Sequence, residues 1–166
     1  MSLGSSLWLG VRSLLWTVLL PGIYAGFIPW QYFGVSHARV AWSNPVHLLA
    51  LAVIVFGVGL LAACVWQFAH AGRGTLSPVD PPRDLVVRGL YQYARNPMYL
   101  SVTAIVLGEV LLIRSRGLLL YWAIWFVLVN LLVRGYEEPD LRRRFGRSYD
   151  DYTRRVGRWI PRFQRG

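Results

Sequence analysis

Four long apolar runs alternate with polar segments along the 166-residue chain, at about residues 7–28, 46–68, 97–113 and 117–136. An α-helix rises about 1.5 Å per residue, so a run of about 20 residues covers the roughly 30 Å hydrocarbon core of a bilayer. The pattern therefore predicts an all-α polytopic membrane helix bundle with about four transmembrane helices. We expect one membrane domain over residues 1–166.

Polar segments divide this domain into four parts. These are an N-terminal helix pair at 7–70, a polar loop and pre-helix at 71–96, a C-terminal helix hairpin at 97–138 and an amphipathic tail at 139–166. The loop is rich in glycine and proline, which do not sustain a helix. Gly72 and Gly74 follow no predicted strand, so they do not form a dinucleotide-binding fingerprint, and no Rossmann unit is expected.

The third and fourth runs are expected to form an antiparallel helix pair. Only a short turn at residues 114–117 separates them, and each run is close to one bilayer thickness in length. The chain therefore returns to the level at which it entered, so Arg95 should meet Glu137 and Glu138 at one membrane face. This junction is where we expect chemistry.

Residues that open the third run favour an anion site. Asparagine is a preferred N-cap and proline is tolerated at the first helical position, so Asn96 and Pro97 predict a helix that begins there. The free N–H groups of a helix N-terminus bind anions, and the adjacent Arg95 adds a full positive charge.

Polar residues also recur within the fourth run, three or four positions apart. Asn130, Arg134, Glu137 and Glu138 should form one stripe that faces the interior of the bundle. An ion pair between Arg134 and Glu138, four residues apart, is the alternative.

Glu109 lies inside the third run, and a carboxylate within a membrane segment is a functional candidate by default. It falls near Arg114 and Arg116, at the end of the run away from Arg95. We therefore favour a structural ion pair or exposure at the interface for this residue.

Beyond Pro139 the apolar residues recur at steps of three and four, with arginines between them: Leu141, Phe145, Tyr149, Tyr152, Val156 and Trp159. This spacing predicts an amphipathic helix that lies on the membrane or packs under the bundle. A positively charged surface anchor explains the tail at least as well as a direct role in catalysis.

Composition narrows the classes of function. A hydrophobic content of 55% is too high for an ordinary soluble domain of this length. The net charge of +10 would suggest a nucleic-acid partner in a soluble protein, but here the arginines flank apolar runs, so we expect none. The chain has no lysine for a Schiff base and a single cysteine, Cys64, so it forms no intrachain disulfide. Its three histidines lack metal-ligand spacing, and no metal site is predicted.

The distribution of arginines predicts the orientation. With four spans, the N-terminus, the 71–96 loop and the tail share one side, which carries most of the arginines. The opposite loops carry only Arg39, Arg114 and Arg116. The positive-inside rule then places the N-terminus, the loop and the tail in the cytoplasm, in a bacterial inner membrane. The first run lacks the features of a cleaved signal peptide and is expected to be a retained helix.

Several short motifs in this order carry a family resemblance. They are Gly89-x-Tyr91-x-Tyr93-x-Arg95-Asn96-Pro97-Met98-Tyr99, then Glu137-Glu138, then Phe145-Gly146-x-x-Tyr149-x-x-Tyr152, then Trp159-Ile160-Pro161. Together they resemble the C-terminal half of the isoprenylcysteine carboxyl methyltransferase and phospholipid methyltransferase families, over about residues 72–162. These families usually have Arg-His-Pro where this chain has Arg95-Asn96-Pro97, so a role for the histidine ring is not carried over.

The resemblance implies a membrane-embedded enzyme that uses S-adenosylmethionine, with S-adenosylhomocysteine as product, and no Rossmann fold. The residue types suit this donor. Arginine and helix N–H groups bind its carboxylate, glutamates accept hydrogen bonds from its amine and ribose, and tyrosine faces attract its sulfonium. The expected catalytic residues are Arg95 and Glu138, and the expected donor-binding residues are Tyr91, Tyr93, Arg95, Asn96, Pro97, Tyr99, Glu137, Glu138 and Tyr152.

The methyl acceptor is expected to be lipophilic or small and to arrive through the lipid bilayer. A prenylcysteine carboxylate, a phospholipid amine and a small thiol all remain open. Two other classes of function also remain open: a membrane reductase of related fold that uses NADPH, and a non-catalytic lipid-binding membrane protein. Binding of S-adenosylmethionine, of NADPH or of neither separates these classes.

Overall fold

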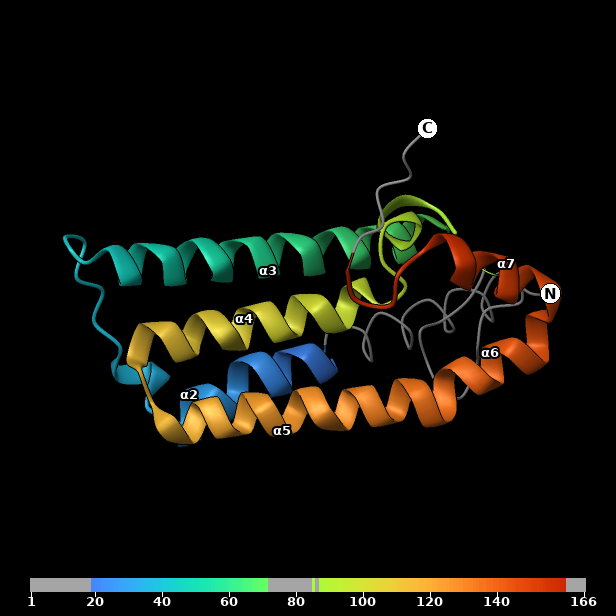
Figure 1. Cartoon of the computed structure of the whole chain (residues 1–166). Helices are drawn as coiled ribbons and strands as arrows, with labels where there is room; N and C mark the ends of the chain where they lie inside the picture. Colours follow the sequence, from blue (N-terminus) through green and yellow to red (C-terminus); the bar gives the residue numbers. More distant parts are fainter. Residues whose placement is uncertain (1–18, 72–84, 86, 161–166) are drawn as a thin grey trace, which may run out of the picture.

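A computed structural model describes residues 19–71, 85 and 87–160. Three long helices lie side by side along the length of the molecule: α3 (Pro45–Ala71), α4 (Pro97–Ile113) and α5 (Arg116–Leu132) (Figure 1). A short helix, α2 (Ile28–Tyr32), lies beside the start of α5. Every element in the described part is helical, apart from one isolated bridge between Ala94 and Gly157. The predicted all-α class is confirmed.

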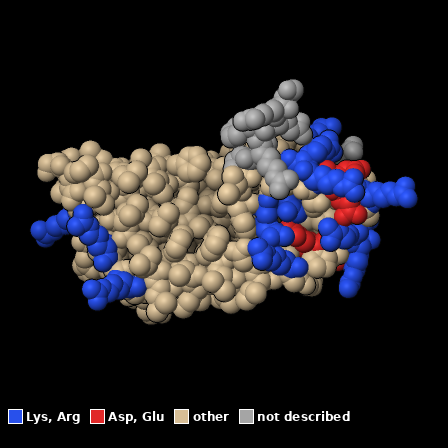
Figure 2. All heavy atoms as spheres, in the orientation of Figure 1, with Lys and Arg blue, Asp and Glu red and all other residues tan. Residues whose placement is uncertain are grey.

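Two described helices are long and apolar enough to cross a membrane. They are Pro45–Gln67, with 23 residues, and Arg116–Phe145, with 30 residues that include the helical continuation of α5. Helix α4 is apolar but shorter. Arginines gather at both ends of the molecule, and the band between them shows no charged side chain on the visible face (Figure 2). This distribution suits a membrane protein, while the count of four spans stays a prediction because the first run begins outside the described residues.

The third run folds as predicted, since α4 begins at Pro97 and ends at Ile113. Ser115 starts the next helix by accepting a hydrogen bond from the backbone N–H of Leu118, which satisfies one of the free donors at the helix start. Helices α4 and α5 are therefore antiparallel neighbours, and the indole of Trp122 donates to the carbonyl of Thr103 across them at 3.0 Å.

Helices α3 and α4 pack at very close range because small residues line their contact. A Cβ placed on Gly57 would lie 2.9 Å from the carbonyl oxygen of Ser101. A Cβ placed on Gly108 would lie 2.8 Å from the carbonyl oxygen of Ala50. Both distances are too short, so the two backbones approach as closely as they do only because these positions are glycine.

Replacing Gly108 with alanine is expected to destabilise the bundle. The added methyl group meets backbone of α3, which cannot move aside as a side chain can, and overpacking of this kind costs about 1–3 kcal/mol. Gly59→Ala is the matched control, because nothing lies within 4 Å of a Cβ at that position. Thermal unfolding in detergent should show a lower midpoint for Gly108→Ala only, and equal midpoints would contradict the close packing.

The tail is not one amphipathic helix, so this prediction is wrong. Helix α6 (Glu138–Phe145) continues α5 through a π-helical turn, η4 (Val133–Glu137), and α7 (Arg147–Arg155) follows separately. Gly146 between them has φ +50°, outside the helical region and accessible mainly to glycine. The spacing of apolar residues continues across this glycine, but the helical backbone is interrupted there.

The predicted polar stripe also needs correction. Asn130, Glu137 and Glu138 are partly buried, whereas Arg134 is exposed. The wider π-turn changes the rotation of the helix at this point, so the regular spacing of three and four residues no longer keeps all four on one face. Arg134 does not pair with Glu138, which has other partners described below.

The interpretation of Glu109 as ion-paired or exposed is wrong as well. Glu109 is 7% exposed, and no hydrogen-bond partner reaches its Oε2 atom. Its position on α4 turns inward beside the buried Val106 and Val110, while Arg114 and Arg116 point to the exposed end of the bundle. Among the ion pairs of the described residues, none involves this carboxylate.

Candidate active site at the charged end of the bundle

Segments distant in sequence meet at the end of the bundle where the acidic residues gather (Figures 1 and 2). A short 3-10 helix, η3 (Gly89–Gln92), leads into α4 and docks on the end of α3. The backbone N–H of Leu90 donates to Gln67 Oε1 at 3.2 Å. Gly89 has φ +59°, and a Cβ there would lie 2.3 Å from the amide of Gln67, so this turn requires glycine.

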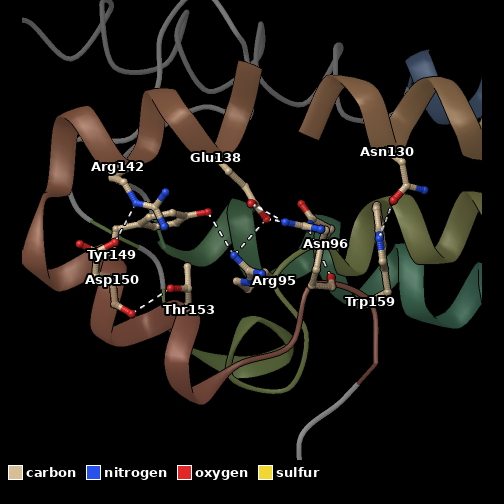
Figure 3. Close-up of polar contacts among 10 residues, drawn as sticks. Arg95, Asn96, Asn130, Glu138, Arg142, Tyr149, Asp150, Thr153 and Trp159 are labelled. Carbon is tan, nitrogen blue, oxygen red and sulfur yellow. Dashed lines mark hydrogen bonds and ion pairs between the residues drawn. The ribbon is translucent and has the colours of Figure 1, made fainter. Parts of the chain in front are cut away.

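Arg95 and Glu138 form an ion pair at the centre of this end. The distance from Arg95 Nη1 to Glu138 Oε1 is 3.0 Å, and their side chains are 12% and 15% exposed (Figure 3). The antiparallel helices thus bring together the two stretches that the sequence predicted to meet. Arg95 Nη1 also donates to the Tyr149 hydroxyl at 3.5 Å. Arg95 Nε is buried and has no partner, so the guanidinium retains a donor for a ligand.

Arg158 is a further member of the site that the sequence analysis did not identify. Its Nε and Nη2 atoms each lie 2.6 Å from an oxygen of Glu138, in the two-point geometry that guanidinium and carboxylate groups favour. A carboxylate has about four lone-pair positions. Arg158 and Arg95 together occupy three of them, which leaves one on Oε2 for a ligand.

Glu137 has a different environment from Glu138. Its Oε1 accepts a hydrogen bond from the hydroxyl of Tyr99, in the first turn of α4. The side chain of Tyr91 lies near this pair, and burial raises the pKa of its phenol well above the usual range, helped by the neighbouring Cys64, Tyr152 and Glu137. The phenol of Tyr91 is therefore neutral at physiological pH.

Tyr152 links α7 to the segment that leads into α4. Its hydroxyl donates to the backbone carbonyl of Tyr91 at 2.6 Å, and its side chain packs with Tyr149 and Val156 in a buried cluster. Burial raises the pKa of Tyr152, so the hydroxyl keeps the proton that it donates. Tyr93, in contrast, is 48% exposed, and no hydrogen bond in the described part joins its side chain to the other site residues.

Asn96 occupies the N-cap position of α4, and Pro97 is the first helical residue, as predicted. The side chain of Asn96 nevertheless does not cap the helix. Its Nδ2 donates instead to the backbone carbonyl of Arg158 at 3.3 Å. Asn96 therefore ties the start of α4 to the tail and leaves the N–H groups of the first turn without a side-chain cap.

No group of three histidine, cysteine, aspartate or glutamate residues in the described part of the chain is placed to hold a metal ion. What the site offers is a guanidinium with a spare donor beside carboxylate oxygens with spare acceptor positions.

Comparison with known proteins assigns the chain to a family. The sequence profile named phospholipid methyltransferase matches residues 45–148, which run from the start of α3 into α7. The chain belongs to the phospholipid methyltransferase family. No individual curated protein matches it. The resemblance drawn from the motifs is confirmed, and the matched region contains Arg95, Glu137 and Glu138.

Membership of this family indicates that the chain is a methyltransferase. The match ends before Arg158 and Trp159, which the structure places at the same site. The only signal for this part of the site in the sequence was the Trp159-Ile160-Pro161 motif, which marks the tail but not the arginine before it.

Proposed function

We propose that this chain is an integral-membrane methyltransferase that transfers a methyl group from S-adenosylmethionine to a lipophilic or small acceptor. The observation that carries the proposal is the buried Arg95 guanidinium, whose Nε has no partner, next to the paired acids Glu137 and Glu138. Buried polar groups are normally paired, so an unpaired donor at this place is explained by a ligand with a complementary acceptor.

The amino-acid end of S-adenosylmethionine fits this arrangement of donors and acceptors. Its carboxylate would bind Arg95 Nε and the uncapped N–H groups at the start of α4. Its ammonium group needs acceptors, and the remaining lone pair on Glu138 Oε2 and the second oxygen of Glu137 supply them. Tyr91 and Tyr99 both lie near Glu137, and the aromatic face of a tyrosine attracts a cation such as a sulfonium.

When bound, the donor supplies an electrophilic methyl carbon, and the protein contributes alignment and exclusion of water. Glu138 is held by two guanidinium groups, which disfavour its protonation, so it orients the donor and is a poor base. Glu137 has only a phenol as partner among its described hydrogen bonds, which makes it the better acceptor for a proton from an amine. A carboxylate or thiolate acceptor needs no base.

The location of the site supports an acceptor with an apolar tail. It lies at one end of apolar helices whose outer faces carry exposed leucine, valine and tryptophan side chains, so an acceptor with an apolar tail reaches it from the bilayer. The positive-inside rule predicts that this end faces the cytoplasm, where the donor is available.

Titration of the purified protein in detergent tests the donor. We expect saturable binding of S-adenosylmethionine and S-adenosylhomocysteine in calorimetry, and none of NADPH. Transfer from a labelled methyl donor to a panel of prenylcysteines, phospholipid amines and small thiols then identifies the acceptor. Binding of NADPH alone would indicate a reductase, and binding of neither ligand would reject the proposal.

A further inference from the structure

The tail doubles back across the candidate site after α7. We use "strap" for residues 156–160, which leave α7 and run beside the start of α4 (Figure 3). The backbone N–H of Arg95 donates to the carbonyl of Gly157 at 2.9 Å, and Ala94 and Gly157 form the bridge noted above. With the bond from Asn96 to the carbonyl of Arg158, the strap is fixed to three consecutive residues around Arg95.

Side chains of the strap bind residues of α5 and α6. Arg158 holds both oxygens of Glu138. The indole Nε1 of Trp159 donates to Asn130 Oδ1 at 2.9 Å, and its ring lies 5.8 Å from that of Phe126, centre to centre. The strap therefore bridges the start of α4 and the end of α5.

Asn130 is a polar side chain within the apolar helix α5. A polar side chain in an apolar span is costly and is retained for a reason. Its Nδ2 donates to the carbonyl of Phe126 at 2.8 Å, which orients the amide so that Oδ1 faces the indole. We use "latch" for this contact between Asn130 and Trp159.

We infer that the strap is a closure over the donor site, in which Arg158 positions Glu138 and the latch between Trp159 and Asn130 governs exchange of donor and product. The inference rests on the proposed function. Arg95 and Glu138 are only 12% and 15% exposed, and the strap is hydrogen-bonded to both of them, so movement of the strap would open a path to these groups for a ligand as large as S-adenosylmethionine. Five hydrogen bonds among the described residues hold the strap, two of them in the ion pair between Arg158 and Glu138. A neutral hydrogen bond contributes about 0.5–1.5 kcal/mol to stability and one to a charged group about 1.5–3 kcal/mol, so the strap opens in a minor population of molecules while the helices stay folded.

Removing the latch should accelerate exchange. Trp159→Phe keeps an aromatic ring near Phe126 and removes the indole N–H, and Asn130→Leu removes its acceptor. Each variant should release S-adenosylhomocysteine about five times faster, the factor that corresponds to one hydrogen bond of about 1 kcal/mol. The double variant should be no faster than either single one, because both changes break the same bond. Trp42→Phe, at a site 73% exposed in the loop before α3, should leave the rate unchanged.

The role of Arg158 has its own readout. Arg158→Gln should raise the KM for S-adenosylmethionine about tenfold, and Arg158→Lys should restore part of that loss because it returns the charge without the two-point geometry. A lower melting temperature with an unchanged KM and unchanged release rates would overturn the closure and leave the proposed function standing. Failure of the unmodified protein to bind the donor would overturn both.

Discussion

Replacing Glu138 with glutamine is expected to cause a larger loss of stability than any other single charge removal in the described part of the chain. Glu138 compensates Arg95 and Arg158, whose side chains are 12% and 23% exposed. The variant leaves two largely buried guanidinium groups without a counterion, and breaking a buried pair from one side costs about 3–5 kcal/mol. For this size of protein such a loss lowers the midpoint of thermal unfolding by roughly 6–20 °C.

A surface carboxylate provides the matched control. Asp140 pairs with Arg144 at 2.7 Å on the same helix, but these side chains are 34% and 38% exposed. Exposed pairs contribute about 0–1 kcal/mol, so Asp140→Asn should shift the midpoint by only a few degrees. Thermal unfolding in detergent, followed by circular dichroism, compares the two variants. Similar shifts would contradict the burial of this ion-pair network and show that the charges around Glu138 are solvated.

A second variant separates loss of the counterion from loss of packing. Adding Arg158→Gln to Glu138→Gln removes one of the two uncompensated charges, so the double variant should be more stable than Glu138→Gln alone. If the loss of stability in the double variant instead equals the sum of the losses in Glu138→Gln and Arg158→Gln, the two side chains do not stabilise each other.

The sequence was sufficient for the hairpin that builds the site. Helix α4 has the bounds that its apolar length and the Asn96-Pro97 start predict, and the short turn before α5 leaves no other choice than antiparallel packing. These features are local, which is why pattern and propensity determine them. The meeting of Arg95 with Glu138 then follows from counting residues along two helices of nearly equal length.

What the sequence could not provide depends on contacts between distant segments. Arg158 is one of 18 basic residues, and nothing in its neighbours distinguishes it from the arginines of a surface anchor. Its role becomes visible only once Gly146 breaks the tail and the strap returns to α4. The same holds for Asn96, whose type predicted a helix cap and whose amide instead binds the strap.

Family membership and geometry contribute different parts of the functional assignment. The phospholipid methyltransferase profile establishes the class of reaction over residues 45–148. The geometry adds which groups at the site have unused hydrogen-bonding capacity: a donor on Arg95 and acceptors on the two glutamates. A zwitterionic ligand end satisfies both kinds of group at once, which neither a purely anionic nor a purely cationic ligand does.

Arg95→Ala is expected to weaken binding of S-adenosylmethionine by more than tenfold, or about 1.4 kcal/mol. The change removes the guanidinium whose Nε is unpaired, and with it the main charge that would face the donor carboxylate. Stability should suffer less than in Glu138→Gln, because Glu138 keeps its two bonds to Arg158. Binding measured below the unfolding temperature of each variant therefore reports on the site itself.

Two further variants distinguish the geometry of the Arg95 guanidinium from its positive charge alone. Arg95→Lys keeps the positive charge but cannot reproduce the planar fork, so its affinity should lie between those of the alanine variant and the unmodified protein. Arg142→Ala removes an arginine from α6 that is 58% exposed and pairs with Asp150 at 2.8 Å, so it should leave donor affinity unchanged. Equal losses in Arg95→Ala and Arg142→Ala would reduce the effect to the overall positive charge of this end, whereas loss in Arg95→Ala alone would locate the donor carboxylate at the unpaired guanidinium nitrogen.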